Sequence, residues 1–209
     1  MPVRKTIPEK DGVYFLTFTC ARWLPLFAIA DGYNYAYKWF DVLVKDGHYI
    51  IGYVIMPSHL HAIIAFRNRG KSLNSIIGNG KRFLAYDLVA ALKQKQETTI
   101  LNQLNEWVNV TDKSRNKEHE VFEPSFDWKE CRTQKFIIQK LNYIHWNPCK
   151  SIPKLAEFPE QYQHSSAKFY ITGEQGVYNV TSYMELMDID LHLTAPLRRT
   201  QYLFRSAEL

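Results

Sequence analysis

The chain has 209 residues, of which 46% are hydrophobic and 14% aromatic, so it holds enough apolar material for one domain with a sizeable core. No apolar run approaches the roughly 18 residues that a membrane-spanning helix needs, and the N-terminus lacks the apolar segment of a secretory signal, so we expect no membrane partner. Three scattered cysteines argue against a disulfide framework and predict a cytoplasmic protein, while the formal charge of +5 favours a polyanionic partner without requiring one.

Strand and helix patterns alternate in the first part of the chain. Gly12 to Cys20 is rich in aromatic and β-branched residues, as strands are. Tyr33 to Lys45 spaces its apolar side chains as a helix does. His48 to Met56 and His59 to Phe66 are two further strands, and the short polar break at Pro57-Ser58 predicts an antiparallel hairpin between them.

A second helical pattern covers Lys71 to Leu92 and is followed by a polar stretch. Gly78 and Gly80 weaken the middle of this helix, so a bend is expected there. Residues 94–120 are polar and sparsely apolar, which predicts an extended insert with a short helix around Ile100 to Val108.

The pattern then returns to a strand and a helix. Aromatic residues in Val121 to Thr133 predict a fourth strand, and Gln134 to Asn147 has helical spacing. This helix should end before Pro148, because a residue that precedes proline is disfavoured in the α region.

The order of these elements predicts the fold class. A β-α-β-β-α-insert-β-α chain is compatible with an α+β, ferredoxin-like (split βαβ) antiparallel sheet with helices packed on one face. Residues 1–170 would form this domain, with 94–120 as its polar insert, and residues 171–209 a basic and aromatic C-terminal extension.

Two histidines stand one residue apart in the apolar run Y-V-I-M-P-S-H-L-H-A-I-I-A-F. His59 and His61 project from one face of the predicted strand, so both imidazoles can point at one spot. Paired imidazoles on a rigid strand indicate a metal site, whereas half-buried histidines satisfied by hydrogen bonds are the alternative. This stretch does not decide between them.

The run K-L-N-Y-I-H-W-N-P in the last helix supplies a second pair of polar groups. Tyr143 and Asn147 are four residues apart and therefore share a helix face. Two imidazole nitrogens and one amide oxygen would hold a divalent cation with open positions, which suits Mg²⁺ or Mn²⁺ and does not exclude zinc. The Tyr143 phenol, on this C-terminal helix, is then a candidate nucleophile.

Together these motifs resemble the single-tyrosine transposases of the His-hydrophobe-His (HUH) endonuclease class, and within it the REP-associated tyrosine transposases. The resemblance covers roughly residues 12–170 and rests on Y-V-I-M-P-S-H-L-H, G-N-G-K-R-F, Y-I-H-W-N-P and H-S-S-A-K-F-Y, in that order. Each motif is weak alone, and their order on matching elements makes the likeness specific.

The resemblance implies a function and a set of roles. His59, His61 and Asn147 would bind the metal, and Tyr143 would attack a phosphorus in single-stranded DNA, leaving a 5′-phosphotyrosine and a free 3′-hydroxyl. The partners would be hairpin-forming DNA strands of REP type, handled by a monomer or homodimer. Residues expected to contact the nucleic acid are Lys81, Arg82 and Lys140. For Lys81 and Arg82 a solvated helix face is the alternative.

Two other functions remain open on the sequence. A domesticated protein could bind DNA hairpins with little or no turnover, although a pure binder need not keep both motifs. A metal-dependent hydrolase could activate water at the histidines, with Tyr143 only orienting the substrate. Water attack would leave no covalent protein–DNA adduct, so the product separates these readings.

Overall fold

The computed structural model describes residues 11–188 of the chain. Its central sheet has four strands in the order β2-β3-β1-β4, and all neighbouring strands are antiparallel. The strands and the helices between them are β1 (Gly12–Thr19), α2 (Tyr33–Lys45), β2 (Tyr49–Ile55), β3 (His59–Phe66), α3 (Leu73–Gln94) and β4 (Asp127–Glu130). This order is that of a split βαβ sheet, so the predicted ferredoxin-like α+β fold is confirmed.

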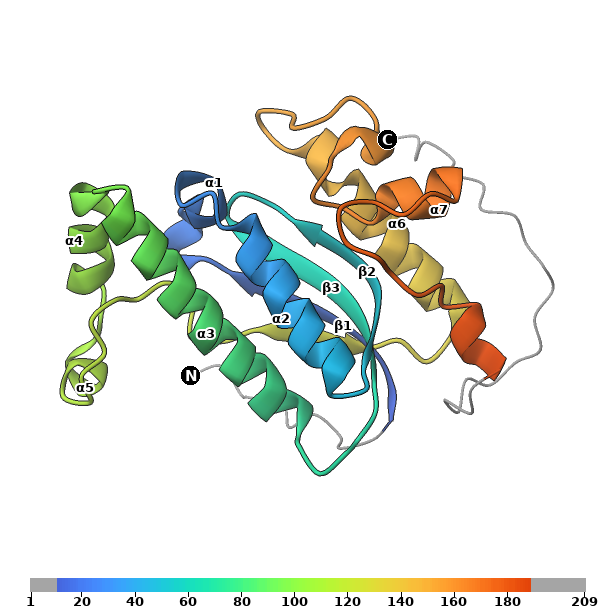
Figure 1. The fold of residues 1–209 in the computed structure, drawn as a ribbon, viewed down its shortest axis with the longest axis horizontal. Coiled ribbons are helices and arrows are strands. Elements are labelled where there is room, and N and C mark those ends of the chain that lie inside the picture. The colour runs from blue at the N-terminus through green and yellow to red at the C-terminus, as the bar shows by residue number, and fades with distance from the viewer. Residues whose placement is uncertain (1–10, 189–209) are drawn as a thin grey trace.

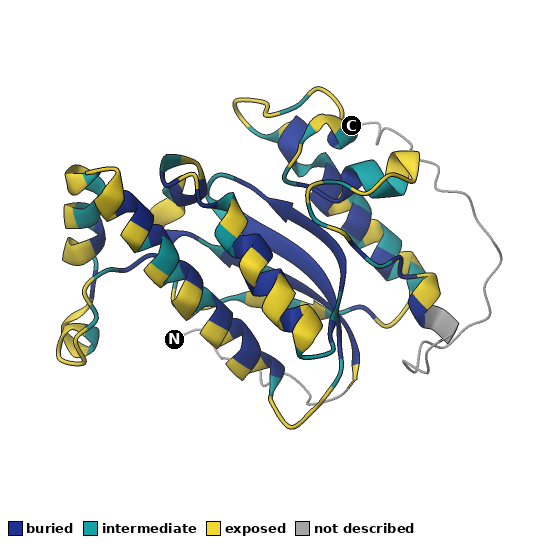
Figure 2. Ribbon diagram, in the orientation of Figure 1, coloured by how far each residue is buried: buried dark blue, intermediate teal, exposed yellow. Residues whose placement is uncertain are grey.

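Helices cover both faces of the sheet (Figures 1 and 2). Helices α2 and α3 pack on the face formed by Tyr14, Leu16 and Phe18 of β1. Helix α6 (Gln134–Lys150) packs on the opposite face, against Val13 and Phe15. The sequence predicted helices on one face only, so the helix on the other face is a difference from that prediction. Alternate side chains of one strand therefore enter two separate apolar cores.

Helix α3 is a single helix of 22 residues, so the expected bend at Gly78 and Gly80 is wrong. Its Gly80 lies against Trp39 of α2, and a Cβ at that position would clash with the indole Nε1. The glycine therefore allows two helices to approach closely. Ser72 caps the helix start by accepting a hydrogen bond from the Ser75 N–H.

Helix α6 also differs from its predicted end, because it runs through Pro148 to Lys150. A proline removes one N–H hydrogen bond from a helix and crowds the preceding turn. Here it falls in the last turn and is buried. Leu155 N–H and the Ser151 hydroxyl donate to the Pro148 carbonyl, which closes the helix end.

The insert is more ordered than the sequence suggested. It contains α4 (Thr98–Glu106) and α5 (Val110–Lys113), which lie at one end of α3 in Figure 1. Leu104 and Val108 are buried, and the Glu120 N–H donates to the Leu104 carbonyl. The fourth strand is short, because only Asp127–Glu130 pairs with β1.

The last described segment returns to the body of the domain. Ser165 forms a bridge with Val54 of β2, and Tyr183 and Leu186 are buried in the core under α6. The remaining short helices are η1 (Ala21–Trp23), α1 (Leu26–Ile29), η2 (Pro159–Gln161), α7 (Ala167–Thr172) and η3 (Glu185–Asp188). The basic and aromatic run expected at 197–206 lies outside the described residues. Within 11–188, no helix is long and apolar enough to cross a membrane.

Candidate active site

The two histidines open β3 at the rim of the sheet, on the face covered by α6. In the β1–β3 register, His59 lies opposite Thr19 and His61 opposite Thr17. The Nδ1 of His61 is 2.6 Å from the Thr17 Oγ1, and the Nδ1 of His59 is 3.2 Å from the Ser58 Oγ. The two rings lie 4.8 Å apart. Hydroxyl groups thus fix both rings through Nδ1.

Helix α6 brings the tyrosine motif to this pair. The ring of Tyr143 lies 5.3 Å from the ring of His61, and the Asn147 Nδ2 lies 3.2 Å from the His61 Nε2. Leu141 and Ile144 anchor the helix by packing on β2 at Gly52, where an added Cβ would meet the Leu141 Cδ2 at 2.5 Å. The helix can therefore lie close enough to the sheet for its polar face to reach the histidines.

Both histidines are held in the neutral form. Burial lowers the pKa of His59 to about 4. Burial, with further contributions from His59 and Lys140, lowers the pKa of His61 to about 3. At neutral pH each imidazole therefore has one unprotonated nitrogen, as a metal ligand requires.

The donor set fits a divalent cation. Asn147 Nδ2 donates to the His61 Nε2, so the Nδ1–H of His61 donates to Thr17 and the Nε2 carries the lone pair. Half a turn of the Asn147 amide would bring its oxygen to the same place, so two nitrogen donors and one oxygen donor would then be available to a cation. No cluster of three or more His, Cys, Asp or Glu suited to a metal occurs among the described residues.

Tyr143 and Lys140 form the solvent side of the site. Tyr143 is 52% exposed and contacts the edge of Phe15, so its hydroxyl group is not enclosed in the core. The Lys140 ammonium lies 4.5 Å from the ring centre of Phe15 and 5.5 Å from that of Tyr143. The structure therefore places one of the three predicted nucleic-acid contacts beside the tyrosine.

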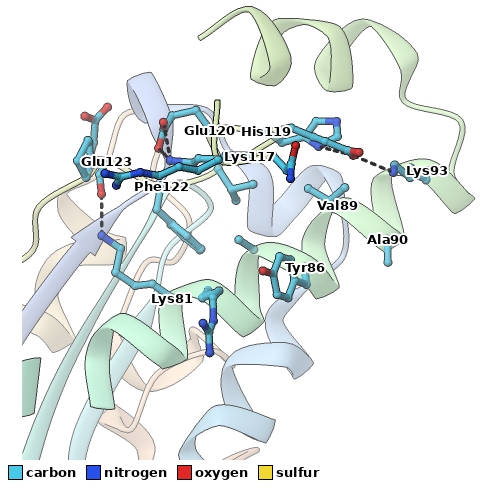
Figure 3. A pocket seen from close by; sticks show the side chains of 17 residues that line it. Lys81, Tyr86, Val89, Ala90, Lys93, Lys117, His119, Glu120, Phe122 and Glu123 are labelled. Carbon is cyan, nitrogen blue, oxygen red and sulfur yellow. Dashed lines mark hydrogen bonds and ion pairs between the residues drawn. The ribbon is translucent and has the colours of Figure 1, made fainter. Parts of the chain in front are cut away.

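The other two predicted contacts, Lys81 and Arg82, lie on α3 and not beside Tyr143. Figure 3 shows the Lys81 ammonium directed at the segment before β4, where it donates to the carbonyls of Glu123 and Ser125. The Arg82 guanidinium lies over the Phe83 ring at 5.2 Å. Both residues line a groove of about 660 Å³ between α3 and residues 115–124. Lys81 thus links helix α3 to the segment before β4.

Several residues of the site were missed by sequence reasoning. Thr17 and Phe15 contact His61, and Trp23 contacts His59 with ring centres 5.2 Å apart. Only the β1–β3 register reveals Thr17, because it is 44 residues from His61 in the chain. His145 takes no part, as expected, because it is fully buried and bonds to the Ser166 Oγ through its Nε2.

Comparisons with known proteins bear on the fold. No family model and no curated protein matches the chain. A solved REP-associated tyrosine transposase, bound to a REP hairpin, matches with a TM-score of 0.54 and 17% identity over 86% of this chain and 92% of that one. A Deinococcus radiodurans R1 protein, provisionally described as a transposase, matches at 13% identity over 64% of this chain and 88% of that one, with a TM-score of 0.40. The chain therefore shares the fold of a REP-associated tyrosine transposase, as its motifs predicted.

Proposed function

We propose that this chain is an HUH-type tyrosine transposase of the REP-associated kind, which cleaves and rejoins single-stranded DNA that carries a hairpin. The observation that supports this function best is the meeting of two distant motifs at one point. Tyr143 and Asn147 from α6 both contact His61 of β3. If these residues only stabilised the fold, the Tyr143 phenol would not need to be half exposed beside two neutral imidazoles.

The described residues divide the chemistry among them. The phenolic oxygen of Tyr143 attacks the scissile phosphorus, a new P–O bond forms, and the bond from phosphorus to the 3′ oxygen breaks. The products are a 5′-phosphotyrosine and a strand with a free 3′-hydroxyl, which takes up the proton. Rejoining is the reverse reaction with another 3′-hydroxyl. Lys140 supplies positive charge next to Tyr143 and attracts the phosphate.

His59, His61 and Asn147 would hold a divalent cation, Mg²⁺ or Mn²⁺, on the strength of the donor set described above. When bound, such an ion supplies positive charge that stabilises the phosphate in the transition state. The protein residues do the positioning. Thr17 and Ser58 hold the two rings, and the packing of α6 on Gly52 sets the distance between Tyr143 and the histidines.

The covalent product is the direct test. A panel of imperfect REP-type hairpins with single-stranded flanks, labelled at the 3′ end, is incubated with the protein and Mn²⁺ and then separated on a denaturing gel. We expect a labelled protein–DNA adduct that EDTA prevents, because the 3′ fragment stays on the tyrosine. Tyr143→Phe should reduce adduct formation by about three orders of magnitude or more.

The matched control is Tyr86→Phe, which changes a tyrosine of similar exposure on α3 and should leave the adduct unchanged. Cleavage of the hairpins without any adduct would replace this proposal with the water-activating hydrolase. Tight hairpin binding with neither cleavage nor adduct would replace it with the domesticated binding protein. An adduct that persists in Tyr143→Phe would refute the assignment of the nucleophile.

A further inference from the structure

Beside the histidine pair stands a large aromatic side chain that the chain does not bury. Trp23 is 64% exposed and is the most exposed of the five tryptophans. Its ring meets the ring of His59 edge to face, with centres 5.2 Å apart and planes at 70°. Most of the indole therefore faces solvent directly next to the candidate active site.

The backbone that carries Trp23 is strained. Arg22 and Trp23 are consecutive residues in the left-handed region, with φ values of 49° and 61°. This conformation is unfavourable for side chains with a Cβ and persists where surrounding contacts impose it. Here the Arg22 N–H donates to the Glu123 Oε1 at 2.8 Å, and the Ala21 N–H donates to the Val121 carbonyl. The chain thus maintains a costly conformation that keeps an indole in solvent.

Further charged and aromatic side chains continue from this point. The Arg22 guanidinium lies over the Trp107 ring, 4.5 Å from its centre. A cavity of about 200 Å³ adjoins both residues and is also lined by Asn109 and Glu120. Glu123, drawn in Figure 3 at the end of the groove beside α3, borders the same cavity. Trp23, Arg22 and Trp107 therefore form a path that leads from His59 to the insert.

We propose that Trp23 is a stacking platform for an unpaired nucleobase that flanks the scissile phosphate. This inference rests on the proposed function, because the histidine pair defines where that phosphate lies. Single-stranded DNA suits the path, since each base offers a flat face for an exposed indole and each phosphate a partner for a cation. A paired base in a duplex has both faces covered by its neighbours. The platform thus selects a single-stranded flank.

Binding of two matched probes tests the platform without any cleavage step. The probes are a short oligothymidylate and an abasic oligomer with the same number of phosphates, each followed by fluorescence anisotropy. We expect the wild-type protein to bind the oligothymidylate more tightly. Trp23→Ala should weaken that binding by roughly 5- to 100-fold, the size of one base–aromatic stack, and leave the abasic probe unaffected.

Two further variants keep the test independent of folding. Trp23→Phe retains a smaller ring on the same backbone and should give an intermediate loss. Phe158→Ala removes an exposed aromatic with no described ring contact to either histidine and should bind as wild type does. Equal losses on both probes in Trp23→Ala and Trp23→Phe would overturn the proposal, as would no loss on either.

The result is distinguishable from that of the adduct experiment. If the adduct forms but the indole does not affect base-dependent binding, the platform is refuted and the transposase stands. If base-dependent binding through Trp23 is observed but no hairpin gives an adduct, the chemistry is refuted and Trp23 remains a nucleic-acid contact.

Discussion

The two faces of the sheet are built from the same strands and differ in what they enclose. On the face under α2 and α3, rings such as Phe18, Trp39 and Phe40 pack into a closed apolar core. On the face under α6, apolar packing around Leu141 gives way toward the rim to hydroxyl, imidazole and amide groups.

This difference shows how a common fold can carry a site. The α2/α3 face supplies rigidity, and the same strands then present His59 and His61 on the other face with little freedom to move. Groups on strands are positioned more precisely than groups on loops. Changes on one face should therefore affect stability alone, and changes on the other should affect both stability and catalysis.

The largest expected effect comes from a pair of glycine substitutions on opposite faces. Gly52→Val would crowd Leu141, Ile144 and Ser166 under α6, whereas Gly80→Ala would crowd Trp39 between α2 and α3. Overpacking should cost each variant about 1–3 kcal/mol of unfolding free energy. Only Gly52→Val should also reduce adduct formation, by about 100-fold, because a shift of α6 separates Tyr143 and Asn147 from His61.

Chemical denaturation gives the stability and the 3′-label assay gives the activity, both at a temperature where each variant is folded. Equal activities of the two glycine variants would contradict the expectation that only the α6 face positions the catalytic groups. A loss of activity in Gly80→Ala would show that the α2/α3 face also sets the geometry of the site.

A smaller effect is expected from the hydroxyl that holds His61. Thr17→Val removes the hydrogen-bond partner of the His61 Nδ1. We expect it to weaken the affinity for Mn²⁺ by about 10- to 100-fold, as loss of a supporting hydrogen bond does at metal sites. The concentration of Mn²⁺ that half-activates cleavage measures this change. The rise in Tm caused by Mn²⁺ measures it without any activity.

The control is Thr19→Val on the same strand, since the described hydrogen bond of Thr19 to Glu123 uses its backbone carbonyl. It should behave as the wild type does. If Thr17→Val kept the wild-type response to Mn²⁺, the hydroxyl would not support a metal ligand.

The sequence predicted those parts of the site that follow from local periodicity. Alternation along β3 placed His59 and His61 on one face, and the four-residue spacing placed Tyr143 with Asn147. Strand order followed from the order of the elements. These inferences need no knowledge of what packs against each element.

The missed features all depend on contacts between distant parts of the chain. Gly80 resembles a helix breaker until Trp39 is seen against it. Lys81 resembles a free cation until it is seen bonded to the carbonyls of Glu123 and Ser125. Trp23 owes its position to a left-handed backbone held by Glu123, about a hundred residues later. Register, close approach and long-range hydrogen bonds are absent from local sequence patterns.

The smallest expected effect is a pH dependence of stability that differs between the faces. Burial lowers the pKa of His59 to about 4 and those of His61 and His145 to about 3, all on the α6 face. In the unfolded chain these groups take up protons near pH 6.5. Between about pH 6.5 and 4 the unfolded state therefore binds more protons, and stability falls as the pH falls, by up to about 1.4 kcal/mol per pH unit for each histidine.

His61→Gln removes one of these titrating groups, so the unfolded state takes up one proton fewer. The curve of unfolding free energy against pH should therefore be flatter across that window. His48 stacks on Phe66 in the core under α2 and α3, and burial lowers its pKa as well, but by less than in the three histidines of the α6 face. His48→Gln should therefore flatten the curve less and over a narrower range. Urea unfolding at half-unit steps of pH measures both slopes. Parallel curves for His61→Gln and the wild type would mean that burial does not lower the pKa of His61 in the folded protein.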